Sequence, residues 1–381
     1  MDFELQQSLS QWRRHLHRHP ELSLNEAETA AFVCRTLTDL GVPFTAGVGG
    51  HGVVATISRG QSNRSVGLRA DMDALPITET TGIAHASVND GVMHACGHDG
   101  HTTSLLGAAA LLARDRDWSG IVHFVFQPAE EGYGGARSML ADGLFDRFPM
   151  ERIFGYHNWP GLEAGTVAVH DGPVMAAGSR IDIVVDGYAG HAALPHLSRD
   201  PLLASAYLLV ALQSLVSRNV DPVDSAVVSI CMMNAGMAVN QIPSQASLHG
   251  TFRTHRRPVR DLVEAGINRV CAGIGETFGV TATVTITHGV SATVNTKDAA
   301  DLAAAAALDH GLAVRRDLPP SMAGEDFGWY LEQKPGAFVW IGNGPAKPGG
   351  ELHNPGYDFN DDILPAAAGW LAATARRALA S

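Results

Sequence analysis

The chain has 381 residues, of which 45% are hydrophobic and 17% are charged, and its formal net charge is −12 at pH 7. This length supports two domains or one large one, and the composition excludes a disordered chain and a small disulfide-stapled module. The longest apolar stretches, such as residues 105–113, are far shorter than the ~20 residues that span a bilayer. Without a long Lys or Arg block, the chain is not expected to bind nucleic acid or an anionic membrane.

The N-terminal third predicts helices that alternate with strands. Apolar residues at helical spacing over residues 5–40, broken at His19-Pro20 and ended by Gly41, predict two helices. Further on, we expect strands at 53–57, 65–69 and 121–126, with an Ala- and Leu-rich helix at 102–113. This alternation indicates an α/β fold.

A glycine-rich segment before the first strand resembles a nucleotide-binding motif. Gly47, Gly49 and Gly52 match the G-x-G-x-x-G pattern, which in a dinucleotide-binding fold follows a strand and opens a helix. Here it is expected to follow a helix and precede a strand. We therefore interpret it as a helix-to-strand turn.

The middle of the chain predicts a second domain. We expect strands at 180–186, 226–232, 245–253 and 280–287, an amphipathic helix at 200–217 and a helix at 259–278. This β-α-β-β-α-β order is ferredoxin-like. After this region the chain returns to the alternation of helices and strands seen in its N-terminal third. We expect helices at 299–310 and 364–379 and a strand at 337–341. We predict a discontinuous α/β catalytic domain (1–177 and 291–381) interrupted by an α+β domain (178–290).

The densest group of metal-binding residue types is His94, Cys96, His98 and His101, among 18 histidines and 4 cysteines in the chain. Residues two apart in an extended loop face the same side, so Cys96 and His98 can bind one metal as thiolate and imidazole. The alternative is a set of surface histidines on a glycine-rich loop. The scattered cysteines and the N-terminus, which has no signal segment, lead us to expect a cytoplasmic protein with free thiols.

Several polar residues follow predicted strands, where open α/β sheets hold their ligands. They are Asp71 and Asp73 after the strand at 65–69, Glu130 and Glu131 after the strand at 121–126, and His157 after a short run at 152–154. Adjacent glutamates allow one to bind a metal while the other moves a proton from water to a leaving amine. Taken alone, Glu130-Glu131 would equally fit solvent-facing charge.

These segments resemble the metal-dependent aminoacylase and carboxypeptidase family, specifically its branch of hippurate hydrolases and indole-3-acetyl-amino-acid hydrolases. The resemblance covers nearly the whole chain. The matching segments are residues 13–23, 68–76, 93–101, 126–132, 190–196, 324–327 and 352–355. It implies a dinuclear-metallopeptidase catalytic domain with an inserted ferredoxin-like lid that is also used for dimerisation.

The resemblance also implies a metal site. Cys96, His98, Glu131, His157 and His353 would bind two divalent metal ions. Soft thiolate tolerates zinc, cobalt or nickel, and carboxylate admits manganese, so the metal stays open.

The resemblance also implies roles for five further residues. Glu130 would be the general base and acid, and His191 in the lid would donate to the oxyanion of the tetrahedral intermediate. Asp73 would orient a metal ligand. Asn240 and Arg253 would hold the substrate's carboxylate. The alternatives are an ordinary loop histidine for His191 and a surface salt bridge for Arg253.

Asp71 and three N-terminal histidines are assigned no ligand role. Most of the wider family has His in place of Asp71, so we interpret Asp71 as supporting the site. The histidines at 15, 17 and 19 lie at the end of a predicted helix and are interpreted as structural.

The expected function is that of a cytoplasmic amidohydrolase that cleaves N-acyl amino acids, hippurate-like, N-acetyl or indole-acyl, into a carboxylic acid and a free amino acid. It would act as a homodimer or higher homo-oligomer on small molecules. One alternative is a dipeptidase or aminopeptidase in which Glu325 or Asp326 binds the substrate's ammonium. The other is a catalytically silent metal- or ligand-binding protein, which the presence of Glu130 disfavours.

Overall fold

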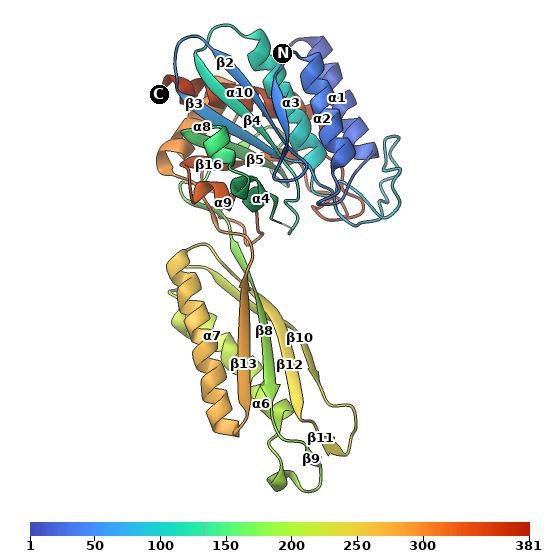
Figure 1. Ribbon diagram of the computed structural model, residues 1–381, viewed down its shortest axis with the longest axis vertical. Helices are drawn as coiled ribbons and strands as arrows, with labels where there is room; N and C mark the ends of the chain where they lie inside the picture. Colours follow the sequence, from blue (N-terminus) through green and yellow to red (C-terminus); the bar gives the residue numbers. More distant parts are fainter. Residues whose placement is uncertain (133) are drawn as a thin grey trace. The chain divides into compact units, whose positions relative to one another are not determined.

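The computed structural model describes residues 1–132 and 134–381, and the chain forms two compact units (Figure 1). The larger unit comprises Met1–Val174, Val294–Pro319 and Asp326–Ser381. The inserted unit comprises Met175–Thr293 and Pro320–Glu325, so it includes a short segment beyond the 178–290 range expected from the sequence. Each unit has its own hydrophobic core.

The larger unit is built on an eight-stranded sheet with strand order β1-β2-β4-β3-β5-β16-β6-β15. Its strands are β1 (Phe44–Val48), β2 (Gly52–Arg59), β3 (Ser65–Asp71), β4 (Gly120–Gln127), β5 (Arg152–Pro160), β6 (Val167–Ala168), β15 (Val314–Arg315) and β16 (Gly336–Gly344). Strands β4, β3, β5 and β16 are parallel neighbours. Their carboxyl ends therefore meet at one edge of the sheet, which is where a ligand site is expected.

The helices of the larger unit pack around this sheet. The long ones are α1 (Phe3–Arg18), α2 (Ala27–Asp39), α3 (His98–Arg114), α8 (Lys297–Asp309) and α10 (Leu364–Ala380), and the short ones are α4 (Gly135–Ala141), α5 (Leu144–Arg147) and α9 (Gly328–Leu331). α10 packs against α3 and α8, and α1 packs against α3. The α/β fold, the pair of N-terminal helices and the main strands are confirmed.

The start of α3 fixes the loop that carries Cys96. Gly97 precedes the helix at φ +91°, a conformation that side chains rarely adopt, and a Cβ there would clash with the amide of Asn158. The tight approach of β5 to this loop therefore requires glycine.

The glycine-rich segment differs from the prediction of a helix-to-strand turn. It joins β1 to β2, which pair antiparallel. The sequence did not reveal β1 because that strand is short and all but its last residue are exposed, so it lacks the alternating apolar pattern of a half-buried strand.

The inserted unit has a four-stranded antiparallel sheet of order β10-β12-β8-β13. Its elements in chain order are β8 (Ala177–Asp186), α6 (Pro201–Ser214), β10 (Ala226–Ala235), β12 (Gln245–Thr254), α7 (Arg257–Phe278) and β13 (Thr281–His288). This β-α-β-β-α-β order confirms the ferredoxin-like prediction. Small two-stranded sheets pair β9 (Gly190–His191) with β11 (Gln241–Ile242), and β7 (Pro173–Met175) with β14 (Thr293–Val294).

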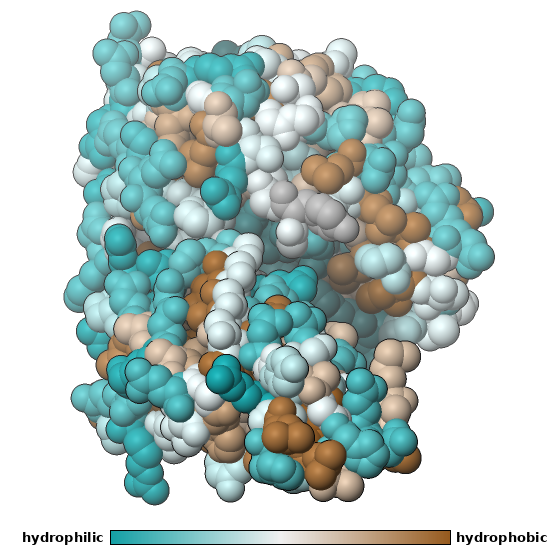
Figure 2. Space-filling model, turned by 60° about the horizontal axis from the view of Figure 1, so that its bottom comes forward, coloured by the Kyte–Doolittle hydropathy of each residue, from teal (hydrophilic) through white to brown (hydrophobic). Residues whose placement is uncertain are grey.

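Helix α6 is apolar on both faces, whereas the sequence predicted an amphipathic helix. Ala204, Leu208 and Leu212 are buried in the core of the inserted unit, but Tyr207 and Val210 are 56% and 71% exposed. With the following π-helical turn it forms Pro201–Asn219, the one helix in the described part of the chain that is long and apolar enough to cross a membrane by length and composition. Figure 2 shows apolar patches among polar side chains on the face it draws.

Candidate metal centre

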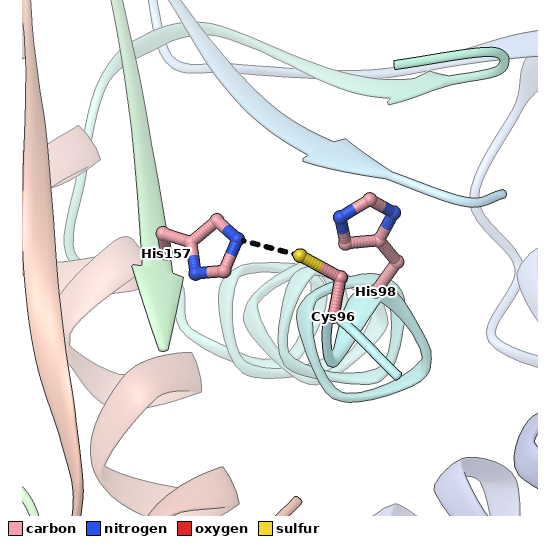
Figure 3. A group of neighbouring side chains, drawn as sticks. All are labelled: Cys96, His98 and His157. Carbon is pink, nitrogen blue, oxygen red and sulfur yellow. Dashed lines mark hydrogen bonds between the residues drawn. The ribbon is translucent and has the colours of Figure 1, made fainter. Parts of the chain in front are cut away.

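Five donors from four segments meet at the carboxyl ends of the strands. They are Cys96 before α3, His98 at the start of α3, Glu131 after β4, His157 in β5, and His353 in the loop before α10. The Sγ atom of Cys96 lies 3.3 Å from Nε2 of His157 and 3.3 Å from Nε2 of His353. In Figure 3 the thiol of Cys96 points at the ring of His157, with His98 beside it.

These donors form two groups that share one atom. Cys96, His98 and His157 form one group, and Cys96, Glu131 and His353 form the other, each with ligand atoms within 4.8 Å of one another. Nε2 of His98 and Oε1 of Glu131 are buried without a hydrogen-bond partner. Because buried polar atoms are normally partnered, these orphaned atoms fit cation ligands. Thiolate, imidazole and carboxylate are the donor types of zinc-like sites, so the set fits two cations with Cys96 common to both.

Asp73 fixes two of these donors. Nδ1 of His98 donates to the main-chain oxygen of Asp73 at 2.9 Å, which directs Nε2 toward the other donors. The carboxylate of Asp73 accepts hydrogen bonds from the Glu131 N–H at 3.0 Å and from Ser23 Oγ at 2.6 Å. Such contacts orient metal ligands. Ser23 belongs to a segment with no predicted site role.

The electrostatics of the donors are those of a site built for positive charge. Burial, together with the carboxylates of Glu131 and Glu130, raises the pKa of the Cys96 thiol well above its usual range. Burial lowers the pKa of His157 well below its usual range, which keeps this imidazole neutral. Burial opposes protonation of His98, but the charge of Asp71 and its other carboxylate neighbours raises its pKa to about 10. A divalent cation would favour the deprotonated form of each donor.

Glu130 lies beside the donors on a strained turn. It is 9% exposed, and one of its carboxylate oxygens groups with donor atoms of His98 and Glu131. The Asp326 N–H donates to Oε1 of Glu130 at 3.2 Å. The preceding Ala129 has φ +52°, and its N–H donates to Oε1 of the buried Glu26 at 2.7 Å. Strain of this kind costs about 1–3 kcal/mol and is typical of functional sites.

A buried arginine, Arg69, connects Asp71, Gln127 and Asp326 beside the donors. It donates to Asp71 at 2.8 Å, to Gln127 at 2.8 Å and to Asp326 at 3.0 Å. The carboxylate of Asp326 also accepts from Gln127 and from the Ala136 N–H at 2.9 Å. These bonds engage Asp326, which removes one of the two residues suggested for binding a substrate's ammonium. No role was predicted for Arg69, although a charged residue in an apolar strand signals a buried partner.

Asp71 is held by neighbouring side chains and also lies close to the donor His98, with which it groups together with His101. Besides Arg69, its carboxylate accepts from Nδ1 of His101 at 2.6 Å and lies 3.7 Å from Nε2 of His98. Nε2 of His101 in turn accepts from the Asn158 N–H at 3.0 Å. This arrangement fits the supporting role predicted for Asp71.

The N-terminal histidines lie outside the donor groups. Nδ1 of His17 contacts Asp99 at 2.8 Å, and both side chains are fully buried. His15 stacks on Phe32 with ring centroids 4.6 Å apart. Both contacts connect helices of the larger unit.

The inserted unit carries the other predicted residues. His191 is exposed and its strand pairs with Gln241, and the Ala192 N–H donates to the main-chain oxygen of Asn240, so His191 and Asn240 are neighbours. His191 and Asn240 lie near the end of β8 that carries Asp186. Arg253 of β12 pairs with Gly178, at the other end of β8. Eight residues of strand separate that pair from Asp186, which corresponds to about 26 Å. Within one copy of the chain, Asn240 and Arg253 therefore do not contact one small carboxylate.

The chain matches known proteins along most of its length. Residues 67–377 match the model of peptidase family M20/M25/M40. The chain is 40% identical over 380 residues to the hippurate hydrolase of Campylobacter jejuni, covering 99% of this chain and 98% of that protein. It is 39% identical over 378 residues to the N-acetyl-L-cysteine deacetylase of Bacillus subtilis, covering 99% and 89%.

A solved structure agrees with the fold. The YXEP protein of Bacillus subtilis, described as a dinuclear metal-binding peptidase of the M20 family, superposes with a TM-score of 0.88 at 36% identity and covers 98% of each chain. Together with the family match, this shows that the chain belongs to peptidase family M20/M25/M40.

Proposed function

We propose that this chain is a metal-dependent amidohydrolase that cleaves N-acyl amino acids into a carboxylic acid and a free amino acid. The observation that carries the proposal is the carboxylate of Glu130, which lies among donors that fit metal ions. The names of relatives about 40% identical, a hippurate hydrolase and an N-acetyl-L-cysteine deacetylase, support the substrate class.

The proposed metal ligands are the five donors Cys96, His98, Glu131, His157 and His353. They would hold two divalent ions, for which manganese, zinc, cobalt and nickel are the candidates. When bound, such ions lower the pKa of water and polarise a carbonyl oxygen.

The protein's own residues then move the proton. Glu130 takes a proton from the attacking water and donates it to the nitrogen that leaves. The Asp326 N–H holds one oxygen of Glu130 during this transfer, and Asp73 keeps His98 and Glu131 in place.

We assign the inserted unit the role of a lid. His191 would donate to the developing oxyanion, and Asn240 and Arg253 would bind the substrate's carboxylate. Because Asn240 lies before the start of β12 and Arg253 lies near its end, they reach the same carboxylate only when they come from two copies of the chain.

The exposed apolar face of the inserted unit supports a homodimer. Tyr207 and Val210 of α6 are exposed, and β10 is an edge strand with exposed Met232 and Met233. Exposed apolar patches and unpaired strand edges are typical of surfaces between subunits. A Val210→Asp variant should then run as a monomer in light scattering, whereas an unchanged mass would exclude this face.

We place the activity in the cytoplasm. All four cysteines are free, Cys96 among them. A reducing compartment keeps such a thiol free of oxidation and able to bind a metal.

The central test is hydrolysis by the metal-loaded protein of N-acetyl and N-benzoyl amino acids, compared with free dipeptides. Glu130→Gln should keep its metal and lower kcat about 10²- to 10⁴-fold. The exposed Glu163→Gln is the matched control and should retain full activity. Wild-type turnover by Glu130→Gln would contradict the mechanism, and a preference for free dipeptides would favour a dipeptidase.

A further inference from the structure

A buried carboxyl group from the loop between α1 and α2 reaches the turn that carries Glu130. Glu26 lies directly before α2 and is fully buried. Its Oε1 atom accepts the hydrogen bond from the Ala129 N–H at 2.7 Å, although the two residues are 103 positions apart in the sequence. Because Ala129 directly precedes Glu130, this contact acts on the main chain next to the proposed general base.

The turn needs such a contact because its conformation is unfavourable. In the described part of the chain, three residues other than glycine have a positive φ, and Ala129 is one of them at +52°. Ala129 is fully buried, so without Glu26 its N–H would lose its partner in a place that water does not reach. A main chain in that situation is expected to change conformation, and Glu130 would move with it.

The same loop also supports the other side of Glu130. Asp73 accepts the hydrogen bond from the Glu131 N–H at 3.0 Å, and Ser23 Oγ donates to Asp73 at 2.6 Å. Ser23 and Glu26 are three residues apart in the loop. Glu131 therefore keeps its own support through Asp73 when the contact of Glu26 is changed, and we expect its role as a metal ligand to survive.

We propose that Glu26 is a positioning residue for the reaction, and that its hydrogen bond to the Ala129 N–H sets where the carboxylate of Glu130 lies. This inference rests on the proposed amidohydrolase function. Glu26 belongs to none of the donor groups found among the described residues. A displacement of about 1 Å in a reacting group can lower a rate about 10²-fold. A change at Glu26 should therefore lower kcat and leave KM and metal content unchanged.

Two variants of Glu26 separate the reach of the side chain from its charge. Glu26→Asp keeps a carboxylate but is one methylene shorter, so it withdraws from the Ala129 N–H. Glu26→Gln keeps an oxygen at the original reach without the charge, and burial raises the pKa of the Glu26 carboxyl, so a neutral side chain suits this position. With N-acetylglycine as substrate, kcat should fall about 10- to 100-fold in Glu26→Asp and stay near wild type in Glu26→Gln. The reverse order would contradict positioning through this hydrogen bond.

Glu21 of the same loop provides the matched control. Its carboxylate accepts from the N–H and the hydroxyl group of Thr29 in α2, and not from the turn that carries Glu130. Glu21→Asp is the same chemical change in the same loop and should keep the wild-type kcat. An equal loss of kcat in Glu21→Asp and Glu26→Asp would show that the loop matters only as a whole and would overturn the specific role of Glu26.

Hydrogen exchange gives a readout that does not depend on turnover. In the metal-loaded protein, the Ala129 amide should exchange faster in Glu26→Asp than in wild type, and Glu21→Asp should leave it unchanged. Unchanged exchange, a wild-type kcat, or a loss of metal that accounts for the loss of kcat in Glu26→Asp would each overturn the positioning role. A wild-type enzyme that cleaves no N-acyl amino acid would instead overturn the proposed function.

Discussion

The two units carry their proposed functional residues in opposite ways. In the larger unit the donors are crowded within a few ångströms, and most are buried and held by further contacts such as those of Asp73. In the inserted unit His191 and Asn240 are exposed, at the opposite end of the sheet from Arg253. The difference teaches that the larger unit brings its donors together within itself, whereas the inserted unit leaves His191 and Asn240 exposed and apart from Arg253.

The two buried cysteines test this contrast most strongly. Cys96→Ser removes the donor shared by both groups, so we expect a loss of metal and activity greater than the ~100-fold typical of residues that only orient ligands. Cys271→Ser, in the core of the inserted unit, is the control and should keep both. Elemental analysis and N-acetylglycine hydrolysis measure the two properties. Full metal content in Cys96→Ser would contradict its role.

Buried and exposed arginines extend the comparison to stability. Arg69→Met removes the one guanidinium that forms ion pairs with both buried carboxylates, Asp71 and Asp326, which should lower the free energy of unfolding by about 3–5 kcal/mol. Arg180→Met on the open face of the inserted sheet breaks only an exposed pair with Asp182 and should not change it measurably. Urea denaturation distinguishes them. Equal stability of the two variants would show that the Arg69 network is not needed for folding.

A buried histidine of the larger unit should make its stability depend on pH. Burial opposes charge on His17, but its hydrogen bonds to Asp99 and Glu79 prevail and raise its pKa from 6.5 to about 9. The resulting stabilisation is complete below pH 6.5 and is lost as pH rises through 9, with a maximum of about 3 kcal/mol. Between pH 6 and 9.5, metal-free wild type should therefore lose about 3 kcal/mol more stability than His17→Gln in urea denaturation, since His98 titrates in both proteins. Parallel pH profiles would disprove the ion pair.

We expect the smallest effect on metal binding from a change at Asp73, which holds two proposed metal ligands in place but does not itself bind the metal. Asp73→Asn keeps the main-chain acceptor of His98 but weakens the carboxylate contacts to Ser23 and Glu131, so metal affinity should fall about 10- to 100-fold. Competition with a chelator measures this. An unchanged affinity would limit Asp73 to a packing role.

The sequence predicted the regular elements well where burial imposes a pattern. The apolar strand β4 and the β8-to-β13 order were predictable because their side chains face a core. Strand β1 and the exposed apolar face of α6 were not, since neither is set by a periodic pattern of burial.

For the site, the sequence identified candidate donors but not what holds them. Motif spacing and family resemblance pointed to the Cys96 cluster. The partners of Glu130 and Asp73 come from remote segments, as with Asp326 and Ser23, and no local pattern marks such pairs. The resemblance also gave no distance between Asn240 and Arg253, which only the register of the sheet revealed.

The most direct test of the account is anomalous diffraction from crystals of the metal-loaded protein at the absorption edge of the bound metal. We predict two peaks, each at bonding distance from the Cys96 thiolate, which is about 2.3 Å for zinc. A single peak, or two peaks of which one lies away from Cys96, would contradict the paired site on which the proposed chemistry depends.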